Sequence, residues 1–563
     1  MSSTATGIAG PSYGTPQSAA GSVEVNNWSF FGRDGSSITP FLVGPIVGTV
    51  TETTARILVE MAHTTAVTME AFMDGQSIYS VTKQQVRGKT PTLFRIEGLA
   101  ARRRILVKVL AEEFEQEREA RFTTMSNKTR WKFAAVSCNC HTKTEKLRLW
   151  ERLGRVIGDV DCVLHLGDQI YADEDFGART NPEMRFDSAW RACLGIVSTL
   201  PPDQWATRRD DMLEHYRQTY RRTWNIPMVA KVLASAANYM ICDDHEVVDD
   251  LGDEPEHTDE RSKEFFVIKV AYQAYCEYQK QLFMETDAVE DFSAKAFYAF
   301  KISPRIGVFM TDNRVERSLH RSEGSEEEWT NRDFLGPRQW ARLTEALEKD
   351  FADCDTLLFG VPTPLVLISQ AATGMAEKVI NDARGTWGHR NFKTEQQDMC
   401  NLLSTWQNER PNRAVISLAG DVHIGGFTDS WHQGHEVPLH QLTASAVGNL
   451  PEGNIDAIKR ALMRQIMHAD QMFFDFKVRH YEWVFGPNYG MVDICLKDEG
   501  RPDVTMTLVQ TKGESNIRNL ELGDSKVPVH KADHGPASEA AHATAEVMDA
   551  PLPPEVEEVP KMI

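Results

Sequence analysis

The sequence predicts an α/β protein in which a β-sheet core flanked by helices follows a small all-β domain. In the larger, later part of the chain, short apolar runs without period-two alternation are separated by amphipathic segments. This pattern is typical of strands that are buried on both faces, with helices between them. In the earlier part, short strand-like runs follow one another with few helical patterns, which indicates a β-sandwich.

Six apolar runs are expected to form the strands of the main sheet. They are residues 132–137, 161–166, 237–242, 306–311, 356–361 and 414–419. Apolar residues at helical spacing predict helices at residues 145–157, 212–224, 265–282, 338–351 and 394–406. Pro337 stands directly before the fourth helix, where its fixed φ and missing N–H suit a first helical position.

These patterns divide the chain into four parts. Residues 1–28 are poor in apolar side chains, and residues 516–563 contain several prolines and acids, so both segments are predicted to be disordered. Residues 29–127 form the predicted sandwich, and residues 130–515 hold the main sheet with its helices. The sandwich strands are expected at residues 55–60, 67–72, 93–96 and 105–110.

Residue types that bind metal ions or phosphate follow five of the six strands of the main sheet. In chain order they are Cys138, Asp168 with Tyr171, the run Asp-Asp-His-Glu at 243–246, Asp312 with Arg314, and Asp421 with His423. Ligands of open α/β sheets gather outside the carboxyl ends of the strands, where loops converge. We therefore expect these side chains to lie close together.

Each of these residues also has a structural explanation when it is taken alone. An Asp or His after a strand is often a turn former or helix cap, and a lone Cys or Tyr often packs in a core. The tetrad at 243–246 is different, because adjacent carboxylates repel each other unless a cation lies between them. A carboxylate can bridge two hard cations, and the phenolate oxygen of a residue such as Tyr171 suits trivalent iron. The set as a whole indicates a metal centre.

The same motifs, in the same order, resemble those of the alkaline phosphatase D (PhoD-like) family of metallophosphatases, which are relatives of the purple acid phosphatases. The segment Leu-Gly-Pro-x-Gln-Trp at 335–340 also resembles a family segment, and the likeness covers roughly residues 131–511. It implies a metallophosphatase-type sheet within residues 130–515. Residues 44–48 and 53–57 resemble the small β-sandwich, of fibronectin or immunoglobulin kind, that often precedes the catalytic domain.

The resemblance implies a dinuclear or trinuclear metal site. Asp168 would be the bridging carboxylate, and Cys138, Tyr171 and His423 would complete a shell around Fe3+. The strand end at 361–363 (Val-Pro-Thr) departs from the purple acid phosphatase pattern, because it offers no His where those enzymes have a ligand. The oxygen-rich ligand set favours hard cations over a pair of zinc ions.

The resemblance also implies roles for the remaining residues. Asp244 and Asp421 would hold a second cation, which the chemistry of the family suggests is Ca2+, with Mn2+ or Zn2+ as alternatives. His245 would sit beside the phosphate as a proton donor or orienting group, and Arg314 would neutralise phosphoryl oxygens. Asp243 would be either a ligand or a residue behind the ligands.

These residue types explain how a phosphate ester would be hydrolysed. Water bound to a metal ion loses a proton near neutral pH and becomes a hydroxide nucleophile. Two cations and the guanidinium of Arg314 would neutralise the oxygens of the phosphoryl group, and His245 could protonate the departing alkoxide.

Composition limits the partners and the cellular compartment. The chain has 563 residues, a formal charge of −20 and nine cysteines. The acidic charge argues against binding to long nucleic acids, but not against a small phosphate ester, because bound cations reverse the sign locally. No run approaches the roughly twenty apolar residues of a transmembrane helix, and no export signal or disulfide framework is visible. We therefore expect a cytoplasmic protein without a transmembrane segment.

Three functions remain open at this point. The first is a metal-dependent phosphoesterase acting on monoesters or diesters, including a phospholipase-like phosphodiesterase. The second is a non-catalytic protein that binds phosphate or metal on the same fold, with the sandwich as an interaction module for an unknown partner. The third, a metalloprotease with His245-Glu246 in its motif, is disfavoured because residue 249 is Asp and the second His ligand is missing.

Overall fold

The structure is a computed structural model, and the residues that it describes belong to one compact unit, Met1–Leu522. The described residues are 39–140, 148–175, 188–284, 296–317, 333–369, 372–374, 385–432, 434–449, 470–473, 475–511 and 516–520. The segments 1–28 and 521–563, both predicted to be disordered, lie outside the described residues. Residues 516–520 form a strand, so the prediction that disorder begins at residue 516 is wrong for these five residues.

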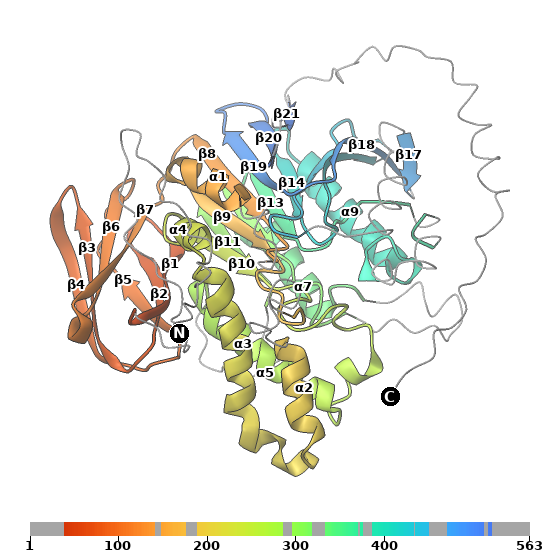
Figure 1. Ribbon diagram of the computed structural model, residues 1–563. Helices are drawn as coiled ribbons and strands as arrows, with labels where there is room; N and C mark the ends of the chain where they lie inside the picture. The colour runs from red at the N-terminus through yellow and green to blue at the C-terminus, as the bar shows by residue number, and fades with distance from the viewer. Residues whose placement is uncertain are drawn as a thin grey trace, which may run out of the picture. The chain divides into compact units, whose positions relative to one another are not determined.

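The first seven strands form two small antiparallel sheets (Figure 1). The strands are β1 (Phe41–Val50), β2 (Ala55–Met61), β3 (Thr65–Met73), β4 (Gln76–Val86), β5 (Thr92–Ile96), β6 (Arg104–Ala111) and β7 (Gln116–Thr123). They pair in the orders β1-β2-β5 and β4-β3-β6-β7. Buried residues alternate with more exposed ones along β3 and β6, because one face of their sheet packs on a hydrophobic cluster shared with the other sheet. The four strands expected here are present, and their assignment to a fibronectin-like or immunoglobulin-like domain stays a prediction.

Two larger sheets contain the strands that were expected in one main sheet. The first has the order β10-β9-β8-β19-β20-β21, and the second has the order β11-β12-β13-β14-β16-β15-β18-β17. The bounds are β8 (Arg130–Val136), β9 (Cys162–Leu166), β10 (Ala237–Ile241), β11 (Tyr298–Ser303), β12 (Ile306–Met310), β13 (Thr356–Val361), β14 (Ala414–Ala419), β15 (Gly425–His432), β16 (Leu439–Thr443), β17 (Asp470–Phe473), β18 (Phe476–Val484), β19 (Asn488–Cys495), β20 (Asp503–Gln510) and β21 (Asn516–Leu520). All six predicted strands are confirmed, three in each sheet.

The parallel strands of the two sheets end at a common edge. Strands β8, β9 and β10 are parallel to one another, as are β12, β13, β14 and β16. Behind this edge, side chains from both sheets form one buried cluster. The loop after β16 is joined to the loop after β8, because Val447 N–H donates to the Ser137 carbonyl at 2.9 Å and Gly448 N–H donates to the Cys138 carbonyl at 3.1 Å. The loops that carry the candidate ligands therefore meet between the sheets.

Helices flank these sheets (Figure 1). They are α1 (Arg148–Val156), α2 (Ala189–Ser198), α3 (Arg209–Trp224), α4 (Pro227–Leu233), α5 (Lys263–Tyr278), α7 (Pro337–Glu345) and α9 (Lys393–Asn408). The five predicted helices correspond to α1, α3, α5, α7 and α9, with Pro337 as the first residue of α7. Helix α5 ends four residues before its predicted end at 282, because the chain continues as a 3-10 turn, Lys280–Leu282. Helices α2 and α4 were not predicted.

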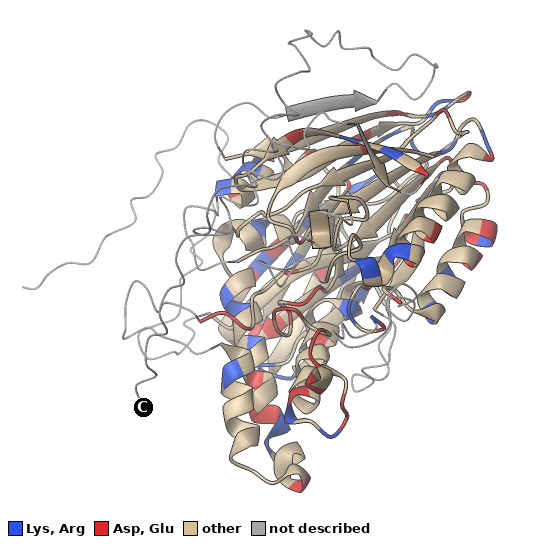
Figure 2. Cartoon of the chain, turned by 90° about the vertical axis from the view of Figure 1, so that its right-hand side faces the viewer, with Lys and Arg blue, Asp and Glu red and all other residues tan. Residues whose placement is uncertain are grey.

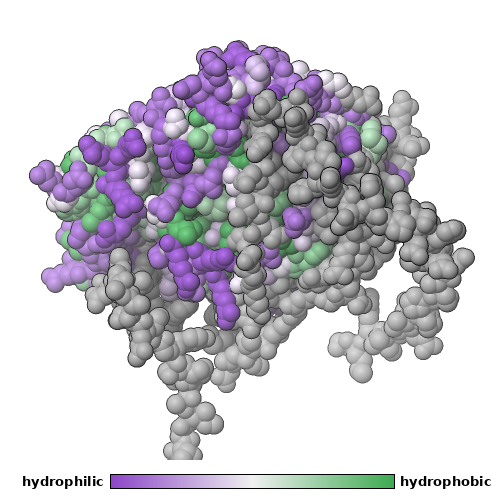
Figure 3. Space-filling view, turned by 90° about the horizontal axis from the view of Figure 1, so that it is seen from above, coloured by the Kyte–Doolittle hydropathy of each residue, from purple (hydrophilic) through white to green (hydrophobic). Residues whose placement is uncertain are grey.

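The described surface is mixed in charge and mostly hydrophilic. Figure 2 shows Lys and Arg interspersed with Asp and Glu over the helices and loops of one face. Among the atoms that Figure 3 colours by hydropathy, hydrophobic areas are small and separated by hydrophilic residues. The exposed large hydrophobic side chains include Phe114, Val156 and Met472. Among the described helices, none is long and apolar enough to cross a membrane.

A buried histidine in the second large sheet predicts acid sensitivity. His480 on β18 is fully buried, with Nδ1 lying 2.9 Å from Thr428 Oγ1, and burial lowers its pKa to about 4 although Asp429 opposes this shift. Because an unfolded histidine titrates near 6.5, only the unfolded state takes up this proton between those values, so the free energy of unfolding falls as the pH falls. We expect His480→Gln to reduce the stability loss between pH 7 and pH 5 by about 2 kcal/mol, measured from urea unfolding. Equal losses in both proteins would contradict this prediction.

Candidate metal centre

The structure brings all the predicted site residues to the common edge of the two large sheets. They follow β8 (Cys138), β9 (Asp168 and Tyr171), β10 (Asp243, Asp244 and His245), β12 (Arg314) and β14 (Asp421 and His423). The loops after β8 and β9 are tied together, because Asn139 N–H donates to the Asp168 carbonyl at 2.8 Å. Convergence at the carboxyl ends of the strands was the main expectation from the sequence, and it is confirmed.

Four of these residues have a backbone conformation that is rare outside glycine. The φ angles are 55° for Cys138, 56° for Asp168, 64° for Asp421 and 56° for His423. A left-handed conformation at a non-glycine residue costs about 1–3 kcal/mol and persists only where the surrounding structure imposes it. Such residues cluster at functional sites, where the strained backbone aims a side chain that a relaxed turn would direct elsewhere.

Four donor atoms lie in a series of close contacts. Asp168 Oδ2 lies 3.4 Å from Cys138 Sγ and 3.5 Å from Tyr171 Oη, and Tyr171 Oη lies 3.2 Å from His423 Nε2. Ligands that bind one small ion at about 2.0–2.3 Å lie roughly 3 Å from one another. Consecutive donors of this group, which we call the four-donor cluster, have the spacing of ligands that share an ion: the Cys138 thiol, the Asp168 carboxylate, the Tyr171 phenol and the His423 imidazole.

Two members of the four-donor cluster, the thiol of Cys138 and the phenol of Tyr171, hold their protons more firmly than usual. Burial raises the pKa of the Cys138 thiol, and the charge of Asp168 raises it further. Burial likewise raises the pKa of the Tyr171 phenol, with the Cys138 and Asp168 groups adding to the effect. Groups of this kind become ligands when a cation displaces their protons, so metal binding here would release protons.

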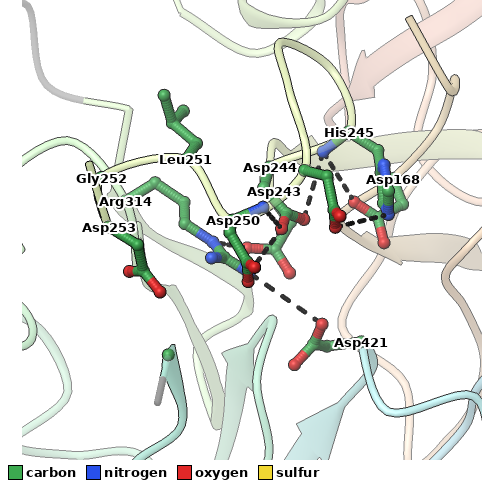
Figure 4. A network of polar contacts seen from close by, with 12 residues as sticks. Asp168, Asp243, Asp244, His245, Asp250, Leu251, Gly252, Asp253, Arg314 and Asp421 are labelled. Carbon is green, nitrogen blue, oxygen red and sulfur yellow. Dashed lines mark hydrogen bonds and ion pairs between the residues drawn. The ribbon is translucent and has the colours of Figure 1, made fainter. Parts of the chain in front are cut away.

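A second group of carboxylates lies beside the first. Oxygen atoms of Asp243, Asp244 and Asp421 lie within 4.8 Å of one another (Figure 4). Oδ2 of Asp243 is buried and accepts no hydrogen bond from the described residues. Three carboxylates share one guanidinium, that of Arg314, which leaves an excess of negative charge that a divalent cation would offset.

The structure places Arg314 against these carboxylates. Its Nε donates to Asp243 Oδ1, and its Nη2 lies 3.3 Å from Asp244 Oδ2 and 3.9 Å from Asp421 Oδ1 (Figure 4). Burial alone would raise the pKa of Asp244, but Arg314 and His245 lower it to about 2. The guanidinium therefore keeps Asp244 ionised, and Asp244 with Asp421 can accept a cation.

His245 is held in a fixed orientation. Its Nδ1 lies 2.9 Å from both carboxylate oxygens of Asp173, and its ring stacks on Tyr171 with 4.1 Å between the ring centroids. Burial alone would lower the pKa of His245, but the carboxylates of Asp173 and Asp244 raise it well above the usual value. These carboxylates favour the protonated imidazolium form of the ring. Its nitrogen also lies within 4.8 Å of oxygens of Asp168 and Asp244, so a ligand role is geometrically open.

Glu246 has a role that the sequence did not reveal. Its carboxylate accepts the backbone N–H groups of Asp168 at 3.0 Å, Gln169 at 2.8 Å and Asp243 at 3.0 Å. One side chain thus joins the loops after β9 and β10. The approach of these loops requires glycine at position 167, where a Cβ would lie 2.5 Å from Asp243 Cβ and where φ is +90°.

Three other neighbours of the site were also missed. Asp173 stands two residues after Tyr171, so the closeness of a further acid to the Gly-Asp-x-x-Tyr motif was an available signal. Ser445 lies 3.1 Å from Cys138 Sγ through its Oγ, and Asn449 Nδ2 lies 3.2 Å from His423 Nε2. Ser445 and Asn449 follow β16, whose mixed run Leu-His-Gln-Leu-Thr gave no strand signal.

Comparisons with known proteins agree with this geometry. A family model described as PhoD-like phosphatase matches residues 133–501, which is more than half of the chain. No curated protein matches the sequence.

Two solved structures resemble the chain. One, described as the structure of PhoD, is 14% identical, covers 85% of this chain and 89% of its own, and has a TM-score of 0.62, which shows a shared fold. Another, described as GAP50, the anchor in the inner membrane complex of Plasmodium, is 9% identical, covers 77% of this chain and 98% of its own, and has a TM-score of 0.35, too low to support an inference. With the family match, the resemblance seen in the order of the motifs is confirmed, and this protein belongs to the PhoD-like phosphatase family.

Proposed function

We propose that this protein is a metal-dependent phosphoesterase that hydrolyses phosphate monoesters or diesters. Membership in the PhoD-like phosphatase family supports phosphoesterase activity. The observation that carries the proposal is the convergence of the four-donor cluster and the carboxylates of Asp244 and Asp421 on one strand edge. Carboxylate, phenol and thiol groups at this density are suited to cations, and phosphate esters need cations to neutralise their oxygens.

The two groups of ligands suit different ions. Cys138, Tyr171, His423 and Asp168 would hold Fe3+, because a phenolate with a thiolate is a donor set suited to trivalent iron. Asp244 and Asp421 would hold Ca2+, because their donors are hard oxygens. When bound, the cations supply Lewis acidity and neutralise charge that develops on the phosphoryl oxygens.

The protein's own residues handle the proton and the phosphate. His245 is held by Asp173, and its raised pKa favours the protonated ring, so it is suited to protonate the alkoxide that leaves the phosphorus. Arg314 is held through Nε by Asp243. With Asp244 and Asp421 neutralised, its Nη atoms would be released to bind phosphoryl oxygens, which Arg binds in a bidentate manner.

The first test concerns the iron ligands. If Tyr171 binds Fe3+, the purified protein has a visible ligand-to-metal absorption band, and Tyr171→Phe removes much of that band while the protein stays folded. Tyr275→Phe is the matched control, because this phenol is equally buried and its hydroxyl has no hydrogen-bond partner among the described residues. Elemental analysis that finds zinc and no iron would contradict the assignment of Fe3+ to this cluster.

The second test separates a metal ligand from the proton donor. Asp168→Asn is expected to lose metal and activity together, with a lower melting temperature, because metal binding stabilises the folded state. Asp161→Asn is the control, since Asp161 lies at the opposite end of β9 and accepts the Lys132 N–H at 2.9 Å. It should keep both metal and activity.

In the same experiment His245→Ala should keep most of its metal and lose on the order of a hundredfold in kcat, the usual scale for general acid catalysis. The loss should shrink for nitrophenyl esters, whose leaving group needs little protonation.

Arg314→Ala should instead weaken the binding of substrate and transition state alike, which raises KM. If His245→Ala strips the metal, His245 is a ligand and its assignment as the acid is wrong. A panel of monoesters and diesters then identifies the preferred substrate class.

A further inference from the structure

The sheet β1-β2-β5 makes close contacts with the segment that follows helix α5. Arg56 on β2 donates from Nη1 to the carbonyl oxygens of Gln281 at 2.9 Å and Met284 at 2.8 Å. On β1, a Cβ at Gly48 would lie 2.4 Å from the Leu282 carbonyl oxygen, so this approach requires glycine. The end of α5 is therefore fixed against the N-terminal sheet by direct contacts.

A buried carboxylate on β2 adds a further contact between this sheet and the end of helix α5. Glu60 on β2 has no exposed surface, and Tyr278, the last residue of α5, donates its hydroxyl to Glu60 Oε2 at 2.6 Å. Arg221 on α3 donates to Glu60 Oε1 from Nε at 2.9 Å and from Nη2 at 2.6 Å. A buried carboxylate with these partners is strongly oriented, because any other position would leave charge unpaired in a dry interior.

The residue after Tyr278 is Gln279, which contacts Glu246 behind the candidate metal centre. Gln279 is fully buried, and its Nε2 donates to Glu246 Oε1 at 3.0 Å and to the Tyr220 hydroxyl at 3.1 Å. The ring of Tyr220 stacks on that of Tyr278, with centroids 4.3 Å apart and planes 4° apart. The same turn is thus held by Glu60 on one side and contacts Glu246 on the other.

We propose that Glu60, Tyr278 and Gln279 are positioning residues through which the N-terminal sheet sets the geometry of the metal centre. Glu60 fixes Tyr278, its neighbour Gln279 orients Glu246, and Glu246 holds the loops after β9 and β10. We call this set the positioning path. Its effect on catalysis rests on the proposed phosphoesterase function, whereas its effect on the loops does not.

The chemistry of Gln279 favours this role over simple core filling. Its Oε1 is buried and accepts no hydrogen bond from the described residues, which is unfavourable for a polar atom in an interior. An apolar side chain of similar volume would fill the same space without that cost. What the amide adds is a donor, Nε2, that bonds to Glu246 and to the Tyr220 hydroxyl.

The test begins with Gln279→Met, which removes the donor and nearly conserves the volume. Gln407→Met is the matched control, because Gln407 on α9 is also fully buried and bonds to the backbone of Val415 and Pro438, away from Glu246. Amide hydrogen exchange is measured over residues 164–171 and 240–246. Gln279→Met should speed exchange there, because Glu246 holds the N–H groups of Asp168, Gln169 and Asp243 less firmly, and the control should not.

The kinetic readout uses nitrophenyl phosphate and its diester. A misplacement of about 1 Å at a reacting centre costs roughly a hundredfold in rate, so a partial shift in Gln279→Met should lower kcat about tenfold with little change in KM. Gln407→Met should keep the wild-type kcat even if its melting temperature falls as much. Unchanged exchange together with unchanged kcat in Gln279→Met would overturn the inference.

A double-mutant cycle tests whether the N-terminal sheet acts through the path. Glu60→Gln should lower kcat several-fold in the wild-type background and have little further effect in the Gln279→Met background, because coupled residues are not additive. Tyr278→Phe, which removes only the hydroxyl, takes the place of Glu60→Gln if that variant does not fold. If the two substitutions lower kcat independently, so that their factors multiply in the double variant, the inference is overturned.

A wild-type protein without phosphoesterase activity would contradict the proposed function. The exchange measurement would still test whether the positioning path holds the two loops.

Discussion

The buried carboxylate of Glu246 accepts hydrogen bonds from three backbone N–H groups that belong to the ends of two strands. Two of these N–H groups belong to Asp168 and Asp243, and the third belongs to Gln169, which follows Asp168. The direction of both candidate site residues therefore depends on this one carboxylate. Burial raises the pKa of Glu246 to about 7, while the hydrogen bonds from Gln279 and the backbone work against that shift. Removal of Glu246 would leave three buried donors unsatisfied, each at a cost of about 1–3 kcal/mol.

Around this anchor, the site combines a strained backbone with crowded charge. Left-handed conformations at Cys138, Asp168, Asp421 and His423 are held by hydrogen bonds between loops. Carboxylates lie close enough to repel one another, and one guanidinium offsets them only in part. Both features are unfavourable, and a bound cation would offset the repulsion between the carboxylates.

The sequence predicts the parts of the fold whose residues repeat a simple pattern. The buried strands at 162–166 and 414–419 are largely apolar runs, and Pro337 starts a helix as its chemistry requires. β16 was missed because two adjacent residues in the middle of the strand, His440 and Gln441, are polar but buried, where their side chains bond to Asp429 and to the Val366 carbonyl. Glu246 bonds to Gln279, 33 positions away, and Arg314 contacts carboxylates that lie still farther away in sequence. Spacing along the chain cannot reveal such contacts.

We propose that the four-donor cluster binds one iron ion. Crystallographic data collected at the iron absorption edge test it most directly, because they locate iron independently of activity. We expect an anomalous peak about 2.0–2.3 Å from Cys138 Sγ, Tyr171 Oη, His423 Nε2 and an oxygen of Asp168. A peak away from Cys138 and Tyr171, or ligands of the cluster that bind zinc in place of iron, would contradict the account.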